Sequence, residues 1–127
     1  MTHKLLLLLA CATTLTFSGC AEGERNRADA AAMTGGDPAR GEQVIDRIGC
    51  ASCHTIPGIR NADALVGPPL TQMARRSYIG GVMKNTPDNM IRWLSDPPGV
   101  DPMTAMPNLH LSDADARDVA SYLYTLR

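Results

Sequence analysis

The residues with the clearest chemistry are Cys50, Cys53 and His54, which form the pattern C-x-x-C-H. This is the attachment pattern of a c-type haem. On a helical turn, residues at i, i+3 and i+4 share one face. Two thiols at this spacing can therefore form thioethers to the two vinyl groups of one porphyrin, and the following histidine reaches the iron from the same side. The motif predicts one covalently bound haem c with His54 as a metal ligand.

Two other chemistries use a C-x-x-C pair. A thioredoxin-like redox pair usually lies in a βαβ context, which is not visible in this sequence. A zinc site needs a fourth ligand beyond Cys50, Cys53 and His54, and C-terminal to the motif the only further His or Cys is His110. A haem-free thiol–disulfide protein, with free reactive thiols at Cys50 and Cys53, nevertheless remains an alternative.

The N-terminal residues carry the pattern of an export signal. Met1–Lys4 is a short basic start, and Leu5–Phe17 is a predominantly apolar run, too short to span a bilayer comfortably and typical of a signal-peptide core. Two small residues then precede Cys20. This arrangement resembles a bacterial lipobox, although Phe17 replaces the usual Leu. We expect residues 1–19 to be a lipoprotein signal peptide and Cys20 to be the site of lipidation.

Ordinary secretion with cleavage near Cys20 and no lipid is the alternative. Cys11 is a weaker lipobox candidate because it leaves a shorter apolar core. In either case the processed chain leaves the cytoplasm, and bacteria attach haem c outside the cytoplasm. We expect a lipid-anchored protein on the periplasmic side of a bacterial membrane. With Cys11 removed, Cys20 lipidated and the other two cysteines on haem, none is left for a structural disulfide.

Composition predicts one small domain behind a tether. Residues 20–35 are rich in Ala, Gly and charge without apolar periodicity, which is typical of a flexible tether. Residues 36–127 then form the domain, which has few aromatic residues, so that a buried haem would supply much of the missing apolar bulk. The chain has 12 Lys and Arg against 13 Asp and Glu. It shows no basic stripe, so nothing supports nucleic-acid binding.

Three helices are predicted around the motif, each beginning at a residue that can cap it. The first starts at Asp37-Pro38, the second at Thr86-Pro87 and the third at Ser112, where Asp115 resembles a capping box with Asp in place of Glu. The run Asp96-Pro97-Pro98-Gly99 should end the second helix. The expected apolar faces are Gly41, Val44, Ile45 and Ile48; Met90, Ile91, Trp93 and Leu94; and Ala116, Val119, Ala120, Leu123 and Leu126.

The expected fold class is all-α, a small helical domain wrapped around one covalently attached haem. No strand pattern of any length is visible, and a helical turn over Leu70–Arg76 is only weakly indicated. Asp113 and Arg117 are expected to pair on the wet side of the last helix. The long connections between the helices would be unusual unless something packs against them, and a haem would do so.

In this order the elements resemble those of a class I cytochrome c over about residues 36–127. The resemblance rests on C-x-x-C-H, on Gly-Pro-x-Leu at residues 67–70 and on Met-Pro at residues 106–107, ahead of the terminal helix. It implies that the Pro68 carbonyl accepts a hydrogen bond from His54 and fixes its orientation. It also implies that Leu70 packs on the haem face and that Met106 is the second axial ligand.

The resemblance implies three further assignments and shows two departures. Gly41 matches the small residue where the first and last helices cross, with Val119 and Tyr122 as its partners. Trp93 matches an aromatic residue near the axial sulfur. The stretch from Gly41 to the C-x-x-C-H motif is one residue longer than in the mitochondrial members, and Ile45 stands where an aromatic residue often packs.

Alternatives remain for the second axial ligand and for the surroundings of the haem. Met103 competes with Met106, and His110 is a further candidate for the sixth ligand. Three residues could bond the haem propionates or form a solvated basic turn: Arg75, Arg76 and Tyr78. Three other methionines are expected to fill gaps in the core: Met73, Met83 and Met90.

A His/Met ligand pair predicts electron transfer. Both faces of the iron are then occupied, little moves on reduction, and the soft thioether raises the potential relative to two imidazoles. We predict a membrane-tethered monohaem c-type cytochrome, not an enzyme, that shuttles single electrons. Its partners would be redox proteins, such as a dehydrogenase, a cytochrome complex or an oxidase, together with the membrane through the lipid anchor.

The alternative function is a haem c gas sensor or enzyme with a displaceable distal ligand. Two features of the sequence argue against known forms of it. Bacterial di-haem peroxidases need a second C-x-x-C-H, which this sequence lacks. Five-coordinate cytochrome c′ bundles carry their motif near the C-terminus, whereas here the motif comes early and a Met-containing loop follows.

Overall fold

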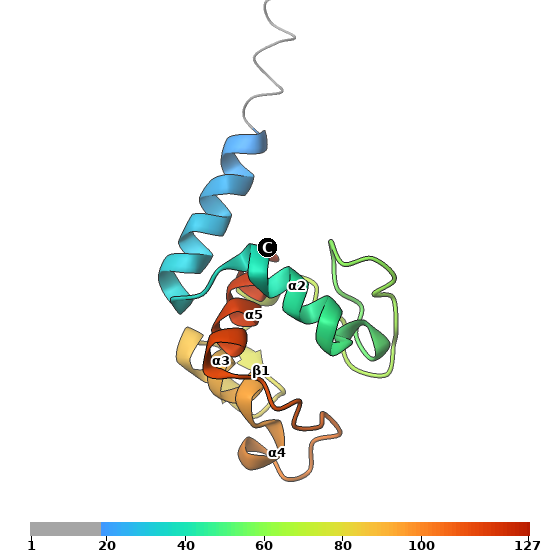
Figure 1. Cartoon of the computed structure of the whole chain (residues 1–127). Coiled ribbons are helices and arrows are strands. Elements are labelled where there is room, and N and C mark those ends of the chain that lie inside the picture. The colour runs from blue at the N-terminus through green and yellow to red at the C-terminus, as the bar shows by residue number, and fades with distance from the viewer. Residues whose placement is uncertain (1–18) are drawn as a thin grey trace, which may run out of the picture.

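A computed structural model describes residues 19–127, and most of the predicted signal peptide lies outside these described residues. The labelled helices are α2 (Pro38–Ile48), α3 (Pro87–Ser95), α4 (Pro97–Val100) and α5 (Asp113–Thr125) (Figure 1). Two 3₁₀ turns, η1 (Cys50–Ser52) and η2 (Met73–Arg75), and one hairpin of β1 (Tyr78–Ile79) and β2 (Met83–Lys84) complete the order. The predicted all-α class is confirmed. Within residues 19–127, every helix is too short or too polar for a membrane span.

Helix α2 begins where the sequence predicts. Asp37 caps it, since its carboxylate accepts hydrogen bonds from the backbone N–H groups of Ala39 (2.7 Å) and Arg40 (3.3 Å). Pro38 occupies the first turn, where an N–H would have no partner within the helix. Gly49 ends the helix at φ 83°, a left-handed conformation that glycine adopts without steric cost, and turns the chain into η1.

Helices α2 and α5 pack against each other, and Gly41 lies at their contact. A Cβ at Gly41 would lie 2.0 Å from the carbonyl oxygen of Asp118 and 3.0 Å from the Cβ of Tyr122. Val119 and Tyr122 are both buried in α5. The close approach at Gly41 therefore agrees with the helix crossing that the family resemblance implies.

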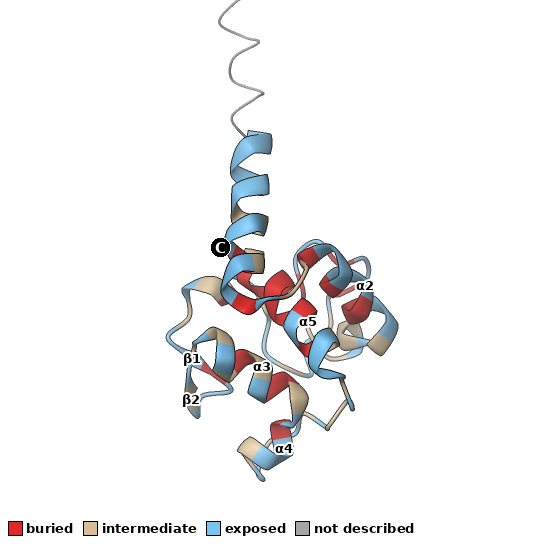
Figure 2. Ribbon diagram, turned by 60° about the vertical axis from the view of Figure 1, so that its left-hand side comes forward, coloured by how far each residue is buried: buried red, intermediate tan, exposed pale blue. Residues whose placement is uncertain are grey.

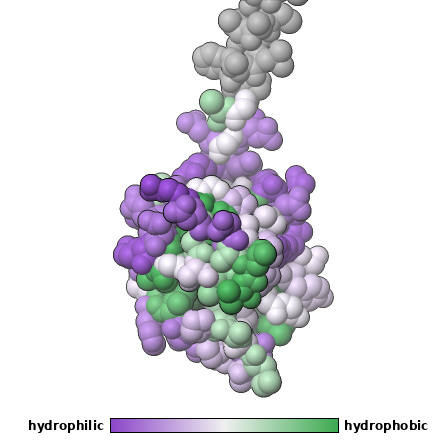
Figure 3. Space-filling model, turned by 90° about the vertical axis from the view of Figure 1, so that its right-hand side faces the viewer, coloured by the Kyte–Doolittle hydropathy of each residue, from purple (hydrophilic) through white to green (hydrophobic). Residues whose placement is uncertain are grey.

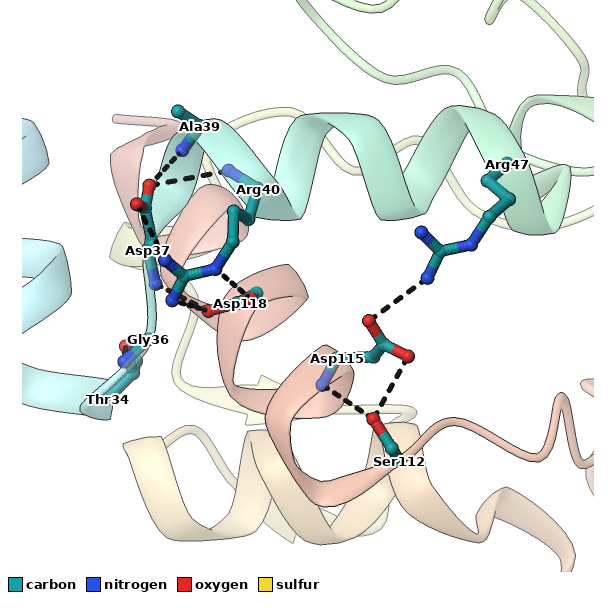
Figure 4. A network of polar contacts seen from close by, with 9 residues as sticks. All are labelled: Thr34, Gly36, Asp37, Ala39, Arg40, Arg47, Ser112, Asp115 and Asp118. Atoms are coloured by element: carbon teal, nitrogen blue, oxygen red, sulfur yellow. Dashed lines mark hydrogen bonds and ion pairs between the residues drawn. The ribbon is translucent and has the colours of Figure 1, made fainter.

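A buried carboxylate also links these two helices (Figure 4). Asp118 accepts hydrogen bonds from the backbone N–H of Asp37 (2.7 Å) and from Nε and Nη2 of Arg40 (2.8 and 3.1 Å). Burial raises the pKa of Asp118, but the hydrogen bonds from Arg40 and Asp37 outweigh burial and hold that pKa below its ordinary value. Arg47 and Asp115 form a second ion pair between the same helices (3.0 Å).

Helix α3 also follows the prediction. The side chain of Thr86 caps it by accepting the backbone N–H of Asn89 (3.3 Å), and the helix ends at Ser95. Its buried side chains are Met90, Trp93 and Leu94. These three side chains belong to the hydrophobic core that surrounds the cavity described below.

The segment predicted only to end α3 forms a further helical turn, α4. Asp96 caps this turn by accepting the backbone N–H of Gly99 (3.2 Å), and it also accepts a hydrogen bond from Nδ2 of Asn108 (3.0 Å). A proline in the first turn of a helix is favourable, which explains why Pro97 both stops α3 and starts α4. Through Asn108, α4 holds the loop that carries Met106.

Helix α5 begins at Ser112, whose hydroxyl oxygen accepts the backbone N–H of Asp115 (3.1 Å). The Asp115 carboxylate accepts from the Ser112 hydroxyl (3.0 Å) and from Arg47, and its side chain is one methylene shorter than the Glu of a capping box. In the described chain no ion pair joins Asp113 to Arg117, so the predicted surface pair is wrong. The buried apolar residues of α5 include Ala116, Val119, Ala120 and Leu123.

The hairpin β1–β2 corrects the expectation that the chain contains no strand. Ile79 pairs with Met83 and Tyr78 with Lys84 in an antiparallel register. Between them, Gly80-Gly81 has positive φ at both residues (56° and 77°), which is the conformation a tight hairpin turn requires. Strands of two residues are too short to show an alternating pattern, so they could not be predicted from hydrophobic periodicity.

Asn85 fastens this hairpin and η2 to α5. Its Nδ2 donates to the carbonyl oxygens of Met73 (2.7 Å) and Arg76 (2.8 Å). Its Oδ1 accepts a hydrogen bond from the hydroxyl of Tyr124 (2.7 Å). Burial raises the pKa of Tyr124 to about 12.

Replacing Tyr124 by Phe is expected to reduce the loss of stability at alkaline pH. The folded protein holds this proton more tightly than the unfolded chain, so the contribution is fully present below about pH 10 and is lost as the pH rises towards about 12. Tyr124→Phe should also lower the free energy of unfolding at neutral pH by about 1 kcal/mol, because the hydrogen bond to Asn85 is lost.

Urea unfolding at neutral pH and at about pH 11 tests this expectation. The control is Tyr78→Phe, which replaces an exposed tyrosine. Equal alkaline losses in wild type and Tyr124→Phe would contradict it.

Residues 19–34 are helical, which differs from the flexible tether that the composition predicts (Figures 1 and 2). Ala30 and Thr34 lie one turn apart on one face and are 0% and 3% exposed. Asp29 forms an ion pair with Arg127 (3.7 Å), which joins this helix to the end of the chain. The high helix propensity of alanine explains the helix, and its buried face is too small to show apolar periodicity.

Candidate haem site

A cavity of about 440 Å³ opens between the C-x-x-C-H segment and the loop that contains Met106. In Figure 1 these two segments lie to the right of α5. Figure 3 faces that side and shows hydrophobic side chains gathered near its middle. All the residues that the sequence analysis assigned to the cofactor line this one cavity: Cys50, Cys53, His54, Pro68, Leu70, Trp93 and Met106.

The turn η1 brings the two thiols and the histidine to one wall. The backbone N–H groups of Cys53 and His54 both donate to the carbonyl oxygen of Cys50 (3.2 and 3.0 Å), which closes the motif into a single tight turn. Burial raises the pKa of the Cys50 thiol. Redox-active C-x-x-C pairs instead rely on a lowered thiol pKa, so this environment does not favour the thiol–disulfide alternative.

A loop at residues 67–68 holds His54 in place. The Nδ1 atom of His54 lies 2.7 Å from the carbonyl oxygen of Pro68. Because a carbonyl only accepts, Nδ1 carries the proton and Nε2 keeps the lone pair that a metal requires. The backbone N–H of Gly67 donates to the carbonyl oxygen of Cys53 (2.7 Å), so the loop and the motif are joined at two points.

The two candidate methionines lie in different surroundings. Met106 is half-buried and lines the cavity, and its backbone N–H donates to Oγ1 of Thr104 (3.2 Å). Met103 is 90% exposed. Among the described residues that line the cavity, neither Met103 nor His110 is present. The geometry therefore places Met106, and not its competitors, where a group in the cavity could reach it.

The three candidates for bonding the haem propionates differ in whether they line the cavity. Arg76 and Tyr78 line the cavity, whereas Arg75 is exposed and outside the described lining. The guanidinium group of Arg76 donates to the carbonyl oxygens of Pro69 and Thr71. Arg76 therefore supports the loop that follows Pro68, in addition to any contact it makes inside the cavity.

Comparison with known proteins decides the family. The sequence model described as cytochrome c matches residues 38–127. The chain belongs to the cytochrome c family. The class I resemblance and covalently bound haem c as the cofactor are thereby confirmed, and Cys50 and Cys53 are positioned as the pair that holds it.

Two curated relatives are both named cytochrome c oxidase subunit 2. The protein from Alkalihalophilus pseudofirmus is 29% identical over 89 residues, which cover 69% of this chain and 25% of the relative. The protein from Bacillus sp. (strain PS3) is 28% identical over 91 residues, which cover 68% and 25%. This cytochrome c thus spans about a quarter of the length of these relatives. No solved structure matches the chain.

The cavity itself fits the family's cofactor. Its volume lies within the roughly 300–1,000 Å³ of pockets that bury small ligands, and most of its lining is apolar. Glycines keep the backbone close to the ring systems: a Cβ at Gly67 would lie 2.5 Å from Cε1 of His54, and one at Gly80 would lie 2.7 Å from Cη2 of Trp93. An apolar space with two thiols and a free imidazole nitrogen on one wall suits a covalently attached haem.

Part of the cavity wall was not predicted from the sequence. Met73 and Met90, expected only as core residues, are buried and also line the cavity. Gly80 and Thr104 line it as well and were not singled out. A Gly-Gly pair within an apolar stretch was the one available signal for the close approach at Gly80.

Replacing Gly67 by Ala is expected to disturb His54 directly. The added Cβ would lie 2.5 Å from Cε1 and 2.8 Å from Nδ1 of that ring, so the ring or the loop must shift and the bond to Pro68 must weaken. A histidine that loses such a partner is a poorer donor to oxidised iron, so the reduction potential should rise on the order of 60 mV, for an affinity change of about tenfold. Protein-film voltammetry measures this. The neighbouring Pro69→Ala variant should leave the potential unchanged, and equal shifts in both would refute the steric account.

Proposed function

We propose that this cytochrome c is an exported, lipid-anchored electron carrier whose haem is ligated by His54 and Met106. The observation that carries the proposal is that both side chains line one apolar cavity together with Cys50 and Cys53. The hydrogen bond from His54 to Pro68 leaves Nε2 available inside that cavity. Haem c supplies a metal that gains and loses one electron at a time.

The residues around the cavity favour transfer without rearrangement. His54 is held through Pro68 and Gly67, and the Met106 loop is held by hydrogen bonds to Thr104 and, through Asn108, to Asp96. Packed side chains resist displacement, so both ligands keep their positions when the charge on the metal changes. Buried apolar groups also exclude water, which favours the less charged, reduced state. We propose that two strong ligands leave no position for a substrate, so the protein is not an enzyme.

An absorption spectrum of the protein expressed in a periplasm, oxidised and reduced, tests the proposal. Sharp low-spin bands, a weak far-red sulfur-to-iron band in the oxidised form and no response to carbon monoxide are the expected results. A high-spin spectrum that shifts with carbon monoxide would favour a gas sensor or an enzyme with a displaceable ligand. A protein whose spectrum has no haem bands would instead favour the thiol–disulfide alternative.

The lipid anchor is proposed from the sequence at Cys20. This residue is exposed in the structure, at the far end of the 19–34 helix from the buried Ala30. A lipid on Cys20 would leave the cytochrome domain outside the bilayer, on the periplasmic side. One acyl chain gives only marginal membrane binding, and a bacterial lipoprotein's several chains make it stable.

Replacing Cys20 by Ser is expected to release the protein from membranes. Without the thiol no lipid can be attached, and once the signal is cleaved no helix among residues 19–127 is long and apolar enough to hold the protein in a membrane. Cell fractionation measures the share of the protein that is bound to membranes. Temperature-induced phase separation in a non-ionic detergent measures the share that carries a lipid. Ala21→Ser, at the next residue, should stay in the membrane fraction. A Cys20→Ser protein that remains bound to membranes would argue against lipidation.

We further propose a terminal oxidase as the electron acceptor. Both relatives carry the name cytochrome c oxidase subunit 2, and the similarity to this chain covers about a quarter of their length. A tethered domain resembling part of an oxidase subunit could deliver electrons to the same type of enzyme. Oxygen uptake by an oxidase reconstituted with the reduced holoprotein tests this, and a dehydrogenase or another cytochrome complex as the faster partner would contradict it.

A further inference from the structure

Every exposed residue that lines the haem cavity is uncharged. The cavity lining includes exposed residues, which form its rim where it opens to solvent. Apart from glycines, these exposed lining residues are Ser52, Val66, Pro68, Tyr78, Ala105 and Pro107, and we call them the uncharged rim. The one arginine in the lining, Arg76, is only partly exposed and donates to two backbone carbonyls.

Large apolar side chains extend this rim outwards. Val66 is 82% exposed and its neighbour Leu65 is 80% exposed, so the described chain covers almost none of their surface. Tyr78 is 58% exposed on a different segment of the rim. Isolated exposed apolar residues are normal, but a group of them around a functional opening marks an interaction surface. Figure 3 shows hydrophobic groups near the middle of this side and hydrophilic groups towards its edges.

We propose that the uncharged rim, with Leu65, is the docking surface for a redox protein whose contacting face is also apolar and uncharged. This inference rests on the proposed electron-carrier function. Electrons enter and leave through the mouth of the cavity, so a partner must cover the rim. A charged partner face would lose its hydration over these side chains and find no opposite charge among them, which disfavours it. The formal net charge of the chain is only −1, so long-range steering adds little.

Electron self-exchange between two copies of the holoprotein tests this surface, because each copy presents the same rim to the other. Nuclear magnetic resonance line widths in mixtures of oxidised and reduced protein give the rate. The wild-type rate should change by less than about twofold between about 10 mM and about 1 M NaCl. The double variant Leu65→Lys/Val66→Lys places like charges at the contact and should exchange at least about tenfold more slowly at low salt, recovering at high salt.

A double variant with the same added charge elsewhere is the control. Ala32 and Gln43 are exposed and lie outside the cavity lining, so Ala32→Lys/Gln43→Lys should exchange like the wild type. A rim variant that matches this control, or a wild-type rate with a strong salt dependence, would overturn the docking surface. Exchange too slow to detect in every protein, together with binding of carbon monoxide, would overturn the electron-carrier function and this inference with it.

Discussion

Met106→Ala is expected to abolish the low-spin spectrum of this cytochrome c and to lower its reduction potential. Met106 is the half-buried methionine that lines the haem cavity, and alanine has no atom that could replace its sulfur. A thioether stabilises the reduced metal, so its loss should lower the potential by about 0.1 V or more, within the roughly 0.8 V that axial ligands control. Voltammetry and the loss of the far-red sulfur-to-iron band measure these effects. The reduced variant should also bind carbon monoxide, which the wild type should not.

Met103→Ala is the matched control for this experiment. Met103 is three residues away, in the same loop, but it is 90% exposed, and its backbone N–H is bonded to the side chain of Asp101 (3.0 Å). Removal of its side chain should leave spectrum and potential as in the wild type. If Met103→Ala and not Met106→Ala removed the sulfur-to-iron band, the assignment of the second axial ligand would be wrong.

Local signals in the sequence predicted the parts of the fold that depend on neighbouring residues. Asp37, Thr86 and Ser112 each cap a helix, because a side-chain oxygen there reaches an N–H two or three residues later. The contacts of the motif are local in the same sense, since Cys53 and His54 both bond to the carbonyl oxygen of Cys50. Such features need only a few residues of context, so one sequence is sufficient to predict them.

Features that depend on distant partners could not be predicted in this way. Asp118 is hydrogen-bonded to Asp37 and Arg40, which lie 81 and 78 residues earlier in the sequence. Tyr124 is hydrogen-bonded to Asn85, 39 residues earlier. The helix over residues 19–34 and the β1–β2 hairpin were missed because one has a very small buried face and the other has very short strands. Composition and periodicity average over windows longer than either feature.

The candidate site combines both kinds of information. Spacing alone pointed to Cys50, Cys53 and His54, whereas Pro68 and Met106 came from the resemblance to a family. The structure brings all five to one cavity. It also adds a difference that the sequence could not provide, since Met103 and Met106 have the same chemistry and nearly the same position but very different exposure.

Gly41→Ala is expected to destabilise the folded protein although alanine is the better helix former. At an exposed position within a helix, replacing glycine by alanine should raise the free energy of unfolding by up to about 1 kcal/mol. At Gly41, however, the new Cβ would lie 2.0 Å from the carbonyl oxygen of Asp118, which belongs to the backbone of α5 and cannot rotate away. The helices must separate, which costs about 1–3 kcal/mol for an overpacked contact and more where a buried polar bond is also stretched. The bonds from Arg40 and Asp37 to Asp118 cross the same contact and would be stretched with it.

Thermal unfolding of the holoprotein measures this, because about 1 kcal/mol shifts the midpoint by roughly 4–8 °C in a domain of this size. Gly23→Ala is the matched control: Gly23 is helical and exposed, and a Cβ there would meet nothing within 4 Å. The two substitutions are chemically identical, so propensity alone predicts that both stabilise or leave the midpoint unchanged. A lower midpoint for Gly41→Ala alone therefore isolates the contact between α2 and α5, on which the wall of the haem cavity is built. If both variants gained stability, the close helix crossing would be refuted.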